Sequence, residues 1–382
     1  MTLAVAALVG GCGGSTTASQ STVAASAAQT SAATAATTTA PQSTSPELIV
    51  CEEETASRDA PVSALSGGPE GVTMTPVTTF SGLTAEGCVL SPDLSKFAEI
   101  SDASDGSKVA GYLPAGGGAF VNLSGHNSNG YSDTPVIDMD PVFNPMTGDL
   151  WWTEESGNSD RLWSAHTAGS APVDQGSANL GGNLAGFTAS GEPVAVALVS
   201  SPDGSLAAFT TKEVWHEDGI ALEIGSAKAL TASCTRHPTG CGLAEIQFLE
   251  GDESPPPCET FLGFASDTAI VCQNEPNGTK RFDRLEFQRA GKKIKVTSDA
   301  PLTPPTQMLI GGVRISPDGK TLWYTATRQA SQTESSPEAH LYIVSTGRST
   351  AEPSPVSLQP EMSLSSIIMA GWRWHGHFSS AG

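Results

Sequence analysis

Charged and aromatic residues are scarce in this chain of 382 residues, of which 15% are charged and 6% are aromatic. Basic residues are especially few: 19 Lys and Arg stand against 40 Asp and Glu, which gives a formal net charge of −21. Binding of nucleic acid needs a basic face, which this composition does not favour. No stretch reaches the roughly 18–20 apolar residues of a membrane-spanning helix. The composition therefore excludes a membrane-spanning protein and a nucleic-acid partner.

Glycine and proline are abundant, with 40 Gly and 26 Pro. Together with apolar runs that stay short, this composition favours many turns and little long helix. The length would suit two or three average domains, although a single all-β barrel or propeller often occupies as much. We expect an all-β fold.

The first twelve residues form an apolar run that ends in small residues and a cysteine. The sequence Val9-Gly10-Gly11-Cys12 resembles a bacterial lipobox, in which the peptide is cut before the cysteine and its thiol is acylated. A complete signal peptide has a basic residue before its apolar run, but no Lys or Arg precedes the run here. The alternative is an ordinary chain end with a chance cysteine. We expect residues 1–11 to be a signal-peptide remnant and Cys12 to carry a lipid.

The stretch behind Cys12 consists almost entirely of Ser, Thr, Ala, Gln and Gly. It has no apolar periodicity, and its β-branched threonines weaken helix. We interpret residues 12–47 as a disordered, lipid-anchored tether. A flexible coil of about 35 residues spans roughly 30–35 Å on average, so the tether would hold the following domain away from the membrane.

Six cysteines remain when Cys12 is set aside, and six cysteines allow 15 pairings. Their spacing favours local disulfides, which an exported protein would form. A zinc site that includes His237 is the alternative, but the segment lacks the usual spacings of structural zinc ligands. The favoured pairs are Cys51–Cys88, Cys234–Cys241 and Cys258–Cys272.

A turn sequence recurs along the chain. In it, Pro fixes φ, Asp bonds to nearby backbone and Gly takes a positive φ, so each copy predicts a tight turn between two strands. Its well-preserved copies are Ser201-Pro202-Asp203-Gly204 and Ser316-Pro317-Asp318-Gly319, each followed by an apolar strand with an aromatic residue. Weaker copies are Ser91-Pro92-Asp93, Asn144–Trp152 and Phe264–Val271.

The turns lie roughly 50–65 residues apart, the length of one four-stranded propeller blade with its loops. Residues 48–378 have room for about six such blades. The last would rest on residues 365–374 and be completed by N-terminal strands that close the ring. We predict a single β-propeller of four-stranded blades, most simply six. A β-sandwich with chance repeats is the alternative.

These Ser-Pro-Asp-Gly turns, followed by an aromatic-bearing strand, resemble those of the TolB-like, WD-repeat-like propellers of bacteria. The resemblance covers most of the chain after residue 80. It implies an exported propeller that serves as a binding platform. It names no ligand, because the shared residues serve the turn and not a reaction.

Motifs that carry chemistry are few. The sequence has no Gly-x-Ser-x-Gly elbow, phosphate-binding loop or dinucleotide fingerprint. His375 and His377 would suit a metal, but no third ligand is near in sequence, so we interpret them as a polar chain end. Asp138 and Asp140 are interpreted as solvated turn residues. We expect no catalytic residue, metal or cofactor.

Two functional hypotheses remain. The first is a non-catalytic, lipid-anchored propeller on the outer face of the bacterial cytoplasmic membrane, which binds a protein or another component of the cell envelope. The second is a propeller enzyme that acts on carbohydrate, a glycoside hydrolase or lyase with carboxylates at the central channel. A hydrolase needs two carboxylates about 5–10 Å apart. Convergent acids in the channel would favour the enzyme.

Overall fold

The computed structural model divides the chain into two units, residues 1–41 and 42–382, and every described residue belongs to the second. Cys12 and most of the predicted tether lie outside the described residues. The described ranges are 45–52, 59–82, 87–124, 136–155, 160–167, 171–177, 180, 183–212, 220–248, 258–275, 278–304, 306–327, 339–347, 353–359 and 367–380.

The first blade joins the two ends of the described chain. Its antiparallel strands, from the inside outwards, are β26 (His377–Ser379), β25 (Ile367–Trp374), β1 (Glu47–Glu52), β2 (Asp59–Gly68) and β3 (Gly71–Ser81). The short strand β24 (Leu358–Gln359) pairs in parallel with β3 at the outer edge. Leu48 faces Trp372 in the ladder, and Glu47 accepts a hydrogen bond from Arg373 at 2.8 Å. The predicted closure of the ring by N-terminal strands is confirmed.

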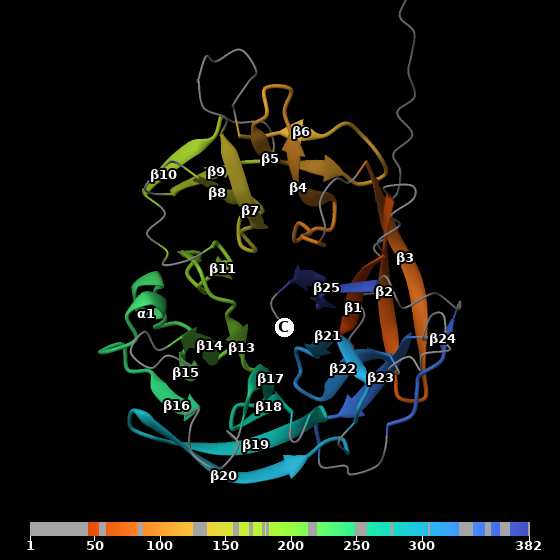
Figure 1. The fold of residues 1–382 in the computed structure, drawn as a ribbon, viewed down its shortest axis with the longest axis vertical. Coiled ribbons are helices and arrows are strands. Elements are labelled where there is room, and N and C mark those ends of the chain that lie inside the picture. Colours follow the sequence, from red (N-terminus) through yellow and green to blue (C-terminus); the bar gives the residue numbers. More distant parts are fainter. Residues whose placement is uncertain are drawn as a thin grey trace, which may run out of the picture. The chain divides into compact units, whose positions relative to one another are not determined.

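The second and third blades form one sheet because a single parallel pair, Lys108 with Ile137, joins them (Figure 1). The second blade has an innermost bridge from Leu90 to Phe97, then β4 (Lys96–Asp102), β5 (Lys108–Pro114) and β6 (Val121–Asn122). The third has β7 (Ile137–Phe143), β8 (Leu150–Glu155), β9 (Arg161–Ala165) and β10 (Val173–Ser177).

The fourth and fifth blades are joined in the same way, by Glu245 and Lys293. The fourth blade has β13 (Val199–Ser200), β14 (Leu206–Lys212), β15 (Ile220–Ser226) and β16 (Ala244–Phe248). The fifth has β17 (Thr260–Ser266), β18 (Ala269–Asn274), β19 (Arg281–Ala290) and β20 (Lys293–Pro301). The sixth has β21 (Leu309–Ile315), β22 (Thr321–Thr327) and β23 (Ala339–Ser345), with a bridge from Tyr342 to Pro355.

Position within a blade explains the side-chain pattern of each strand. The inner strand β22 is buried almost throughout, since blades cover both of its faces, whereas the outermost β20 alternates exposed and half-buried residues. Figure 1 shows β7, β13, β17, β21 and β25 facing a common centre. Trp323 of the sixth blade packs edge-on against Trp372 of the first, with ring centroids 5.7 Å apart. The core thus lies between neighbouring blades, which stack radially as predicted.

A small hairpin between the third and fourth blades was not predicted. It consists of β11 (Gly186–Phe187) and β12 (Pro193–Val194). The short helix α1 (Ala232–Arg236) lies against it, and the Ala232 amide donates to Glu192 at 2.7 Å. Its turn, Thr188–Glu192, matches Ser-Pro-Asp-Gly position by position only at the glycine, so the repeated turn sequence did not indicate this hairpin. Within the described ranges, no helix is both long and apolar enough to cross a membrane.

Candidate functional site: the central channel

The repeated turns share one hydrogen-bond pattern. The Ser316 hydroxyl donates to Asp318 at 2.6 Å and accepts from the Thr321 amide at 3.0 Å. Asp318 also accepts from the Lys320 amide, while the Gly319 amide donates to the Ser316 carbonyl. The turns that begin at Ser91 and Ser201 repeat these bonds with their own residues. The serine and aspartate therefore hold the turn closed, as a local side-chain-to-backbone network does.

The same bonds stabilise the ionised carboxylates. Hydrogen bonds from Ser201 and Ser205 lower the pKa of Asp203 to about 2. Burial acts to raise the pKa of Asp93, but hydrogen bonds from Ser91 and Ser95 outweigh burial and lower it to about 2. Both values lie below the ordinary 3.8. These turns thus contribute stability that is complete above the unfolded-state pKa and is lost as pH falls towards 2.

We expect the thermal midpoint of unfolding to fall steeply between about pH 4 and pH 2, because the folded carboxylates bind protons there less readily than unfolded ones. The double variant Asp93→Asn, Asp203→Asn should unfold at a lower temperature at pH 6 and show a shallower fall at acid pH. Thermal scans at pH 6, 4 and 2.5 measure both quantities. Parallel curves for variant and wild type would contradict the role given to these carboxylates.

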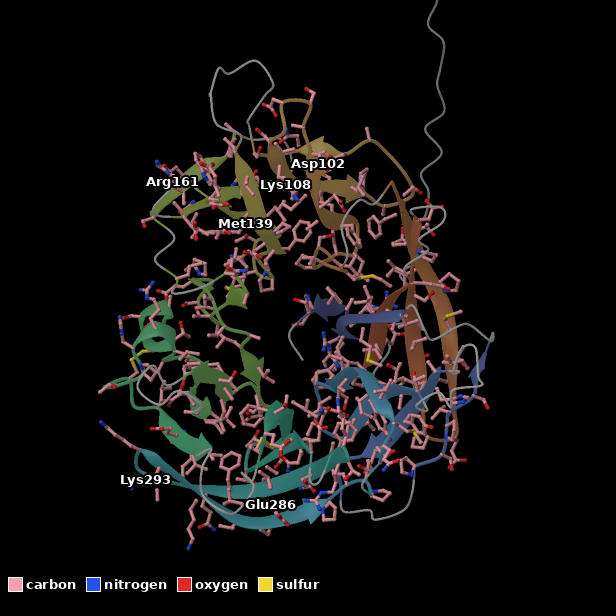
Figure 2. All side chains as sticks on the ribbon, in the orientation of Figure 1. Asp102, Lys108, Met139, Arg161, Glu286 and Lys293 are labelled. Atoms are coloured by element: carbon pink, nitrogen blue, oxygen red, sulfur yellow. A yellow bond between two sulfur atoms is a disulfide. The ribbon has the colours of Figure 1, made fainter. Side chains whose placement is uncertain are left out.

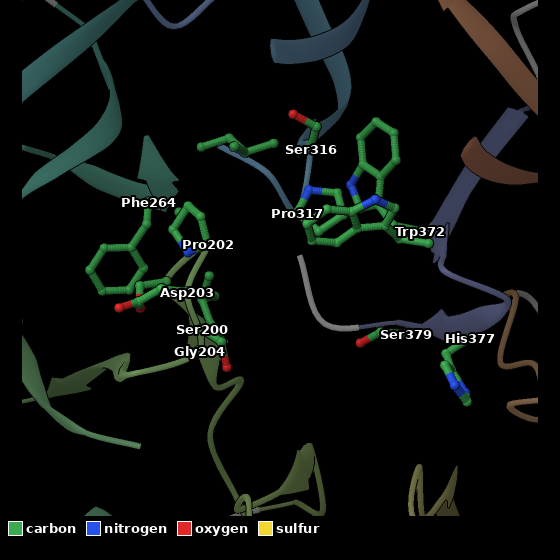
Figure 3. A pocket seen from close by; sticks show the side chains of 15 residues that line it. Ser200, Pro202, Asp203, Gly204, Phe264, Ser316, Pro317, Trp372, His377 and Ser379 are labelled. Atoms are coloured by element: carbon green, nitrogen blue, oxygen red, sulfur yellow. The ribbon is translucent and has the colours of Figure 1, made fainter. Parts of the chain in front are cut away.

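Two cavities lie where these turns meet the innermost strands. The first has a volume of about 410 Å³ and is lined by the turn residues Pro202 and Pro317, by Phe264 of β17 and by Trp372 of β25 (Figure 3). The second has a volume of about 220 Å³. It is mainly apolar, with walls that include Leu90, Phe143, Phe187, Leu198 and Phe378, and Arg314 is the one charged side chain among the described residues that line it.

The strand β26 (His377–Ser379) contributes residues to both cavities. It pairs with β25 on the side opposite β1, through a tight turn at His375 and Gly376 with φ of 49° and 81°. His377 lines the first cavity, Phe378 lines the second, and Ser379 borders both. This alternation follows from the two-residue period of a strand.

The structure brings most predicted turn residues to these cavities. Ser201, Pro202, Asp203, Gly204, Ser316 and Pro317 line the first, and Pro92 lines the second. The sequence reasoning missed Arg314, Trp372 and Trp374 as cavity residues. Its available signal was the tract Trp372-Arg373-Trp374, in which side chains of one kind recur at strand spacing. The Nε1 atoms of both tryptophans are buried and have no hydrogen-bond partner among the described residues.

The acids do not converge on the cavities. Asp203 is the one carboxylate among the described residues that line them, and Ser201 and Ser205 already engage it. The interpretation of Asp138 as a solvated turn residue is wrong: it lies in β7, is 1% exposed and accepts from the Ala110 amide of the next blade at 2.8 Å. Asp140 lies in the same strand, at a bulge with φ of 51°. Both carboxylates therefore sit in the blade and not on a surface turn.

All six predicted cysteines lie in pairs, with the pairing that their spacing favoured. The Cα–Cα distances are 6.2 Å for Cys51–Cys88, 5.8 Å for Cys234–Cys241 and 5.2 Å for Cys258–Cys272. The first pair links β1 of the first blade to the start of the second blade, and the second pair joins Cys234 within α1 to Cys241 in the segment after the helix. The third pair holds β17 near its partner strand β18. His237, which the alternative hypothesis assigned to a zinc site, is the C-cap residue of α1.

Six blades closed by a terminal strand, with turns and cavities around one axis, define the chain as a β-propeller. No protein-family model and no curated protein sequence matches it. Among solved structures, it is similar to a candidate TolB from Agrobacterium tumefaciens, with 11% identity, a TM-score of 0.37, and coverage of 81% of this chain and 88% of that one.

Two further solved structures are longer proteins. TolB from Acinetobacter baumannii has 11% identity and a TM-score of 0.31, with 82% of this chain and 53% of that chain covered. A puromycin hydrolase has 14% identity and a TM-score of 0.33, with 83% and 49% covered. The chain thus spans about half the length of each. These likenesses concern the fold, which the strand ladders described above establish independently.

Proposed function

We propose that this chain is an exported binding propeller that recognises a protein of the cell envelope at the channel mouth, where the Ser-Pro-Asp-Gly turns lie. The composition of the cavities carries this proposal. Walls that combine aromatic rings with a few polar groups, here the rings of Trp372 and Trp374 and the guanidinium of Arg314, are typical of recognition sites. Tryptophan and arginine are also enriched where proteins bind one another.

The disulfides support export. Three pairs in one chain are typical of proteins outside the reducing cytoplasm. We further propose that Cys12 anchors the propeller to the outer face of the membrane through the tether. In cells fed a fatty-acid analogue, the wild-type protein should become labelled and the Cys12→Ala variant should not.

Hydrolysis of carbohydrate is the second candidate, and one observation favours it. Asp267, in the turn between β17 and β18, interacts with Asp203, and burial together with that neighbouring charge raises the pKa of Asp267. Two carboxylates with pKa values pushed apart can divide the roles of acid and base. Both are exposed to solvent, however, whereas an acid–base pair gains most in a site that excludes water. Binding is therefore the better-supported function.

Photo-reactive residues at three exposed apolar positions test the proposal. Met146 is 63% exposed beside Pro145 at the mouth of the second cavity, and Val173 is 53% exposed on the outermost strand of the same blade. Leu309 is 55% exposed at the end of β21 remote from the Ser316 turn. After illumination of intact cells, we expect a protein adduct at Met146 and none at Val173.

The other outcomes each overturn part of the proposal. Adducts at Leu309 but not at Met146 would move the site to the opposite face. Absence of adducts at both Met146 and Leu309 would contradict the proposed protein-binding function. Turnover of a soluble glycan that is abolished by Asp267→Asn would establish the hydrolase instead.

A further inference from the structure

Arg314 occupies an unusual place for a cation. It lies on β21, the innermost strand of the sixth blade, just beyond the bulge at Gly311 and Gly312. It lines the second cavity, whose other walls are largely apolar. Burial lowers the pKa of Arg314, although a guanidinium remains charged in proteins.

The guanidinium of Arg314 has no carboxylate counterpart within the described ranges. Its Nη1 donates to the neighbouring Val313 carbonyl at 2.9 Å, and its buried Nε has no hydrogen-bond partner among the residues that the structure describes. Other arginines of the chain are paired with acids, in Arg161–Asp174, Arg281–Asp283, Arg284–Glu286 and Arg373–Glu47. Arg289 likewise contacts a backbone carbonyl, that of Gly242, but it is exposed to solvent, so Arg314 is distinguished by its place in the wall of an apolar cavity.

A desolvated charge without a counter-charge destabilises a fold, because its lost hydration is not replaced. Such a group is explained when a ligand supplies the opposite charge. Guanidinium matches a carboxylate with two parallel hydrogen bonds, which makes carboxylate the fitting anion. The apolar walls then require an apolar group next to that carboxylate. A cavity of about 220 Å³ has room for a terminal residue with its side chain.

We propose that Arg314 and the apolar walls of the second cavity bind the C-terminal carboxylate of a polypeptide whose last side chain is apolar. This inference rests on the proposed protein-binding function and names the chemistry that the partner presents. Arg314 takes the carboxylate, and Phe143, Phe187 and Phe378 lie around the apolar side chain. Ser379, which borders both cavities, marks the path along which the preceding residues reach the first cavity.

Calorimetric titration of the full chain tests the site with three probes. N-acetyl-Gly-Gly-Phe should bind, and its C-terminal amide should bind at least tenfold more weakly, because the amide has lost the charge that Arg314 recognises. The third probe, 3-phenylpropionate, carries the same ring and carboxylate without a peptide. It should bind more weakly than the tripeptide, which also reaches the first cavity.

Matched variants locate the effect. Arg314→Met should bind the tripeptide acid at least tenfold more weakly, while Lys293→Met, at an exposed cation on the outer strand β20, should bind as wild type does (Figure 2). Arg314→Met should also unfold at a temperature no lower than wild type, because it removes a partly buried charge that has no acidic partner within the described ranges. A ligand-induced rise in the unfolding temperature should be present in wild type and absent in Arg314→Met.

Several results would overturn the inference. Equal binding of acid and amide, or undiminished binding by Arg314→Met, would remove the carboxylate site. A lower unfolding temperature of Arg314→Met would reveal an internal structural partner. Tighter binding of 3-phenylpropionate than of the tripeptide would assign the site to small free acids. Loss of acid recognition with intact Met146 adducts refutes this site alone, whereas absent adducts refute the proposed function.

Discussion

Gly319→Ala should destabilise the protein by about 2–5 kcal/mol, clearly more than the same change in the equivalent turn of the fourth blade. Gly319 has φ of 71°, and a Cβ there would lie 2.5 Å from the Ala265 carbonyl oxygen and 2.8 Å from Cγ of Pro202. The first neighbour is backbone, so the clash cannot be relieved by a side-chain rotation. The strain of a left-handed alanine, roughly 1–2 kcal/mol, adds to roughly 1–3 kcal/mol of overpacking.

Gly204 provides the matched control. It occupies the same place in its turn with φ of 70°, but a Cβ there would meet nothing within 4 Å. Gly204→Ala should therefore cost only the conformational strain of about 1–2 kcal/mol. Urea unfolding of both variants gives the two free energies. Equal losses would contradict the close contact of the turns of the fourth, fifth and sixth blades at the channel mouth.

The parts of the fold that follow from local chemistry were predictable from the sequence. Pro, Asp and Gly in order specify a turn between strands, and the spacing of the turns specified blades. The copy Ser91-Pro92-Asp93 was recognised although Leu94 replaces the glycine. Leu94 takes φ of 59°, and its side chain is 7% exposed within the core between the first two blades. Burial of an apolar side chain there offsets the strain of the backbone.

The parts that depend on long-range packing were not predictable. Nothing local in the sequence places Arg314 inside a cavity, because its neighbours Val313 and Ile315 read as an ordinary strand. The hairpin β11–β12 is too short for a strand pattern, and its turn at Thr188 shares only the final glycine with the repeat. Asp138 looked like a turn residue because aspartate is common in turns. Its burial follows from the Ala110 amide of the neighbouring blade, a partner 28 residues away.

Removal of the Cys51–Cys88 disulfide should have the largest effect among the three disulfides. In the chain-entropy model, a bond that spans 37 residues contributes about 3–4 kcal/mol, whereas the seven-residue span of Cys234–Cys241 contributes about 2 kcal/mol. Cys51 is 2% exposed in the core. It lies in β1, the strand that pairs with β25 to close the ring. The loss should therefore appear first at the closure of the ring.

Two double variants make the comparison, because each removes one disulfide and leaves alanine at both positions. The first is Cys51→Ala with Cys88→Ala, and the second is Cys234→Ala with Cys241→Ala. Urea unfolding should show the larger loss for the first variant. Hydrogen exchange should show faster exchange of the β1 and β25 amides in that variant and unchanged exchange in β14 and β15, since the fourth blade does not depend on the closure. Equal losses in the two variants, or unchanged exchange in β25, would show that the strand ladder alone holds the ring closed.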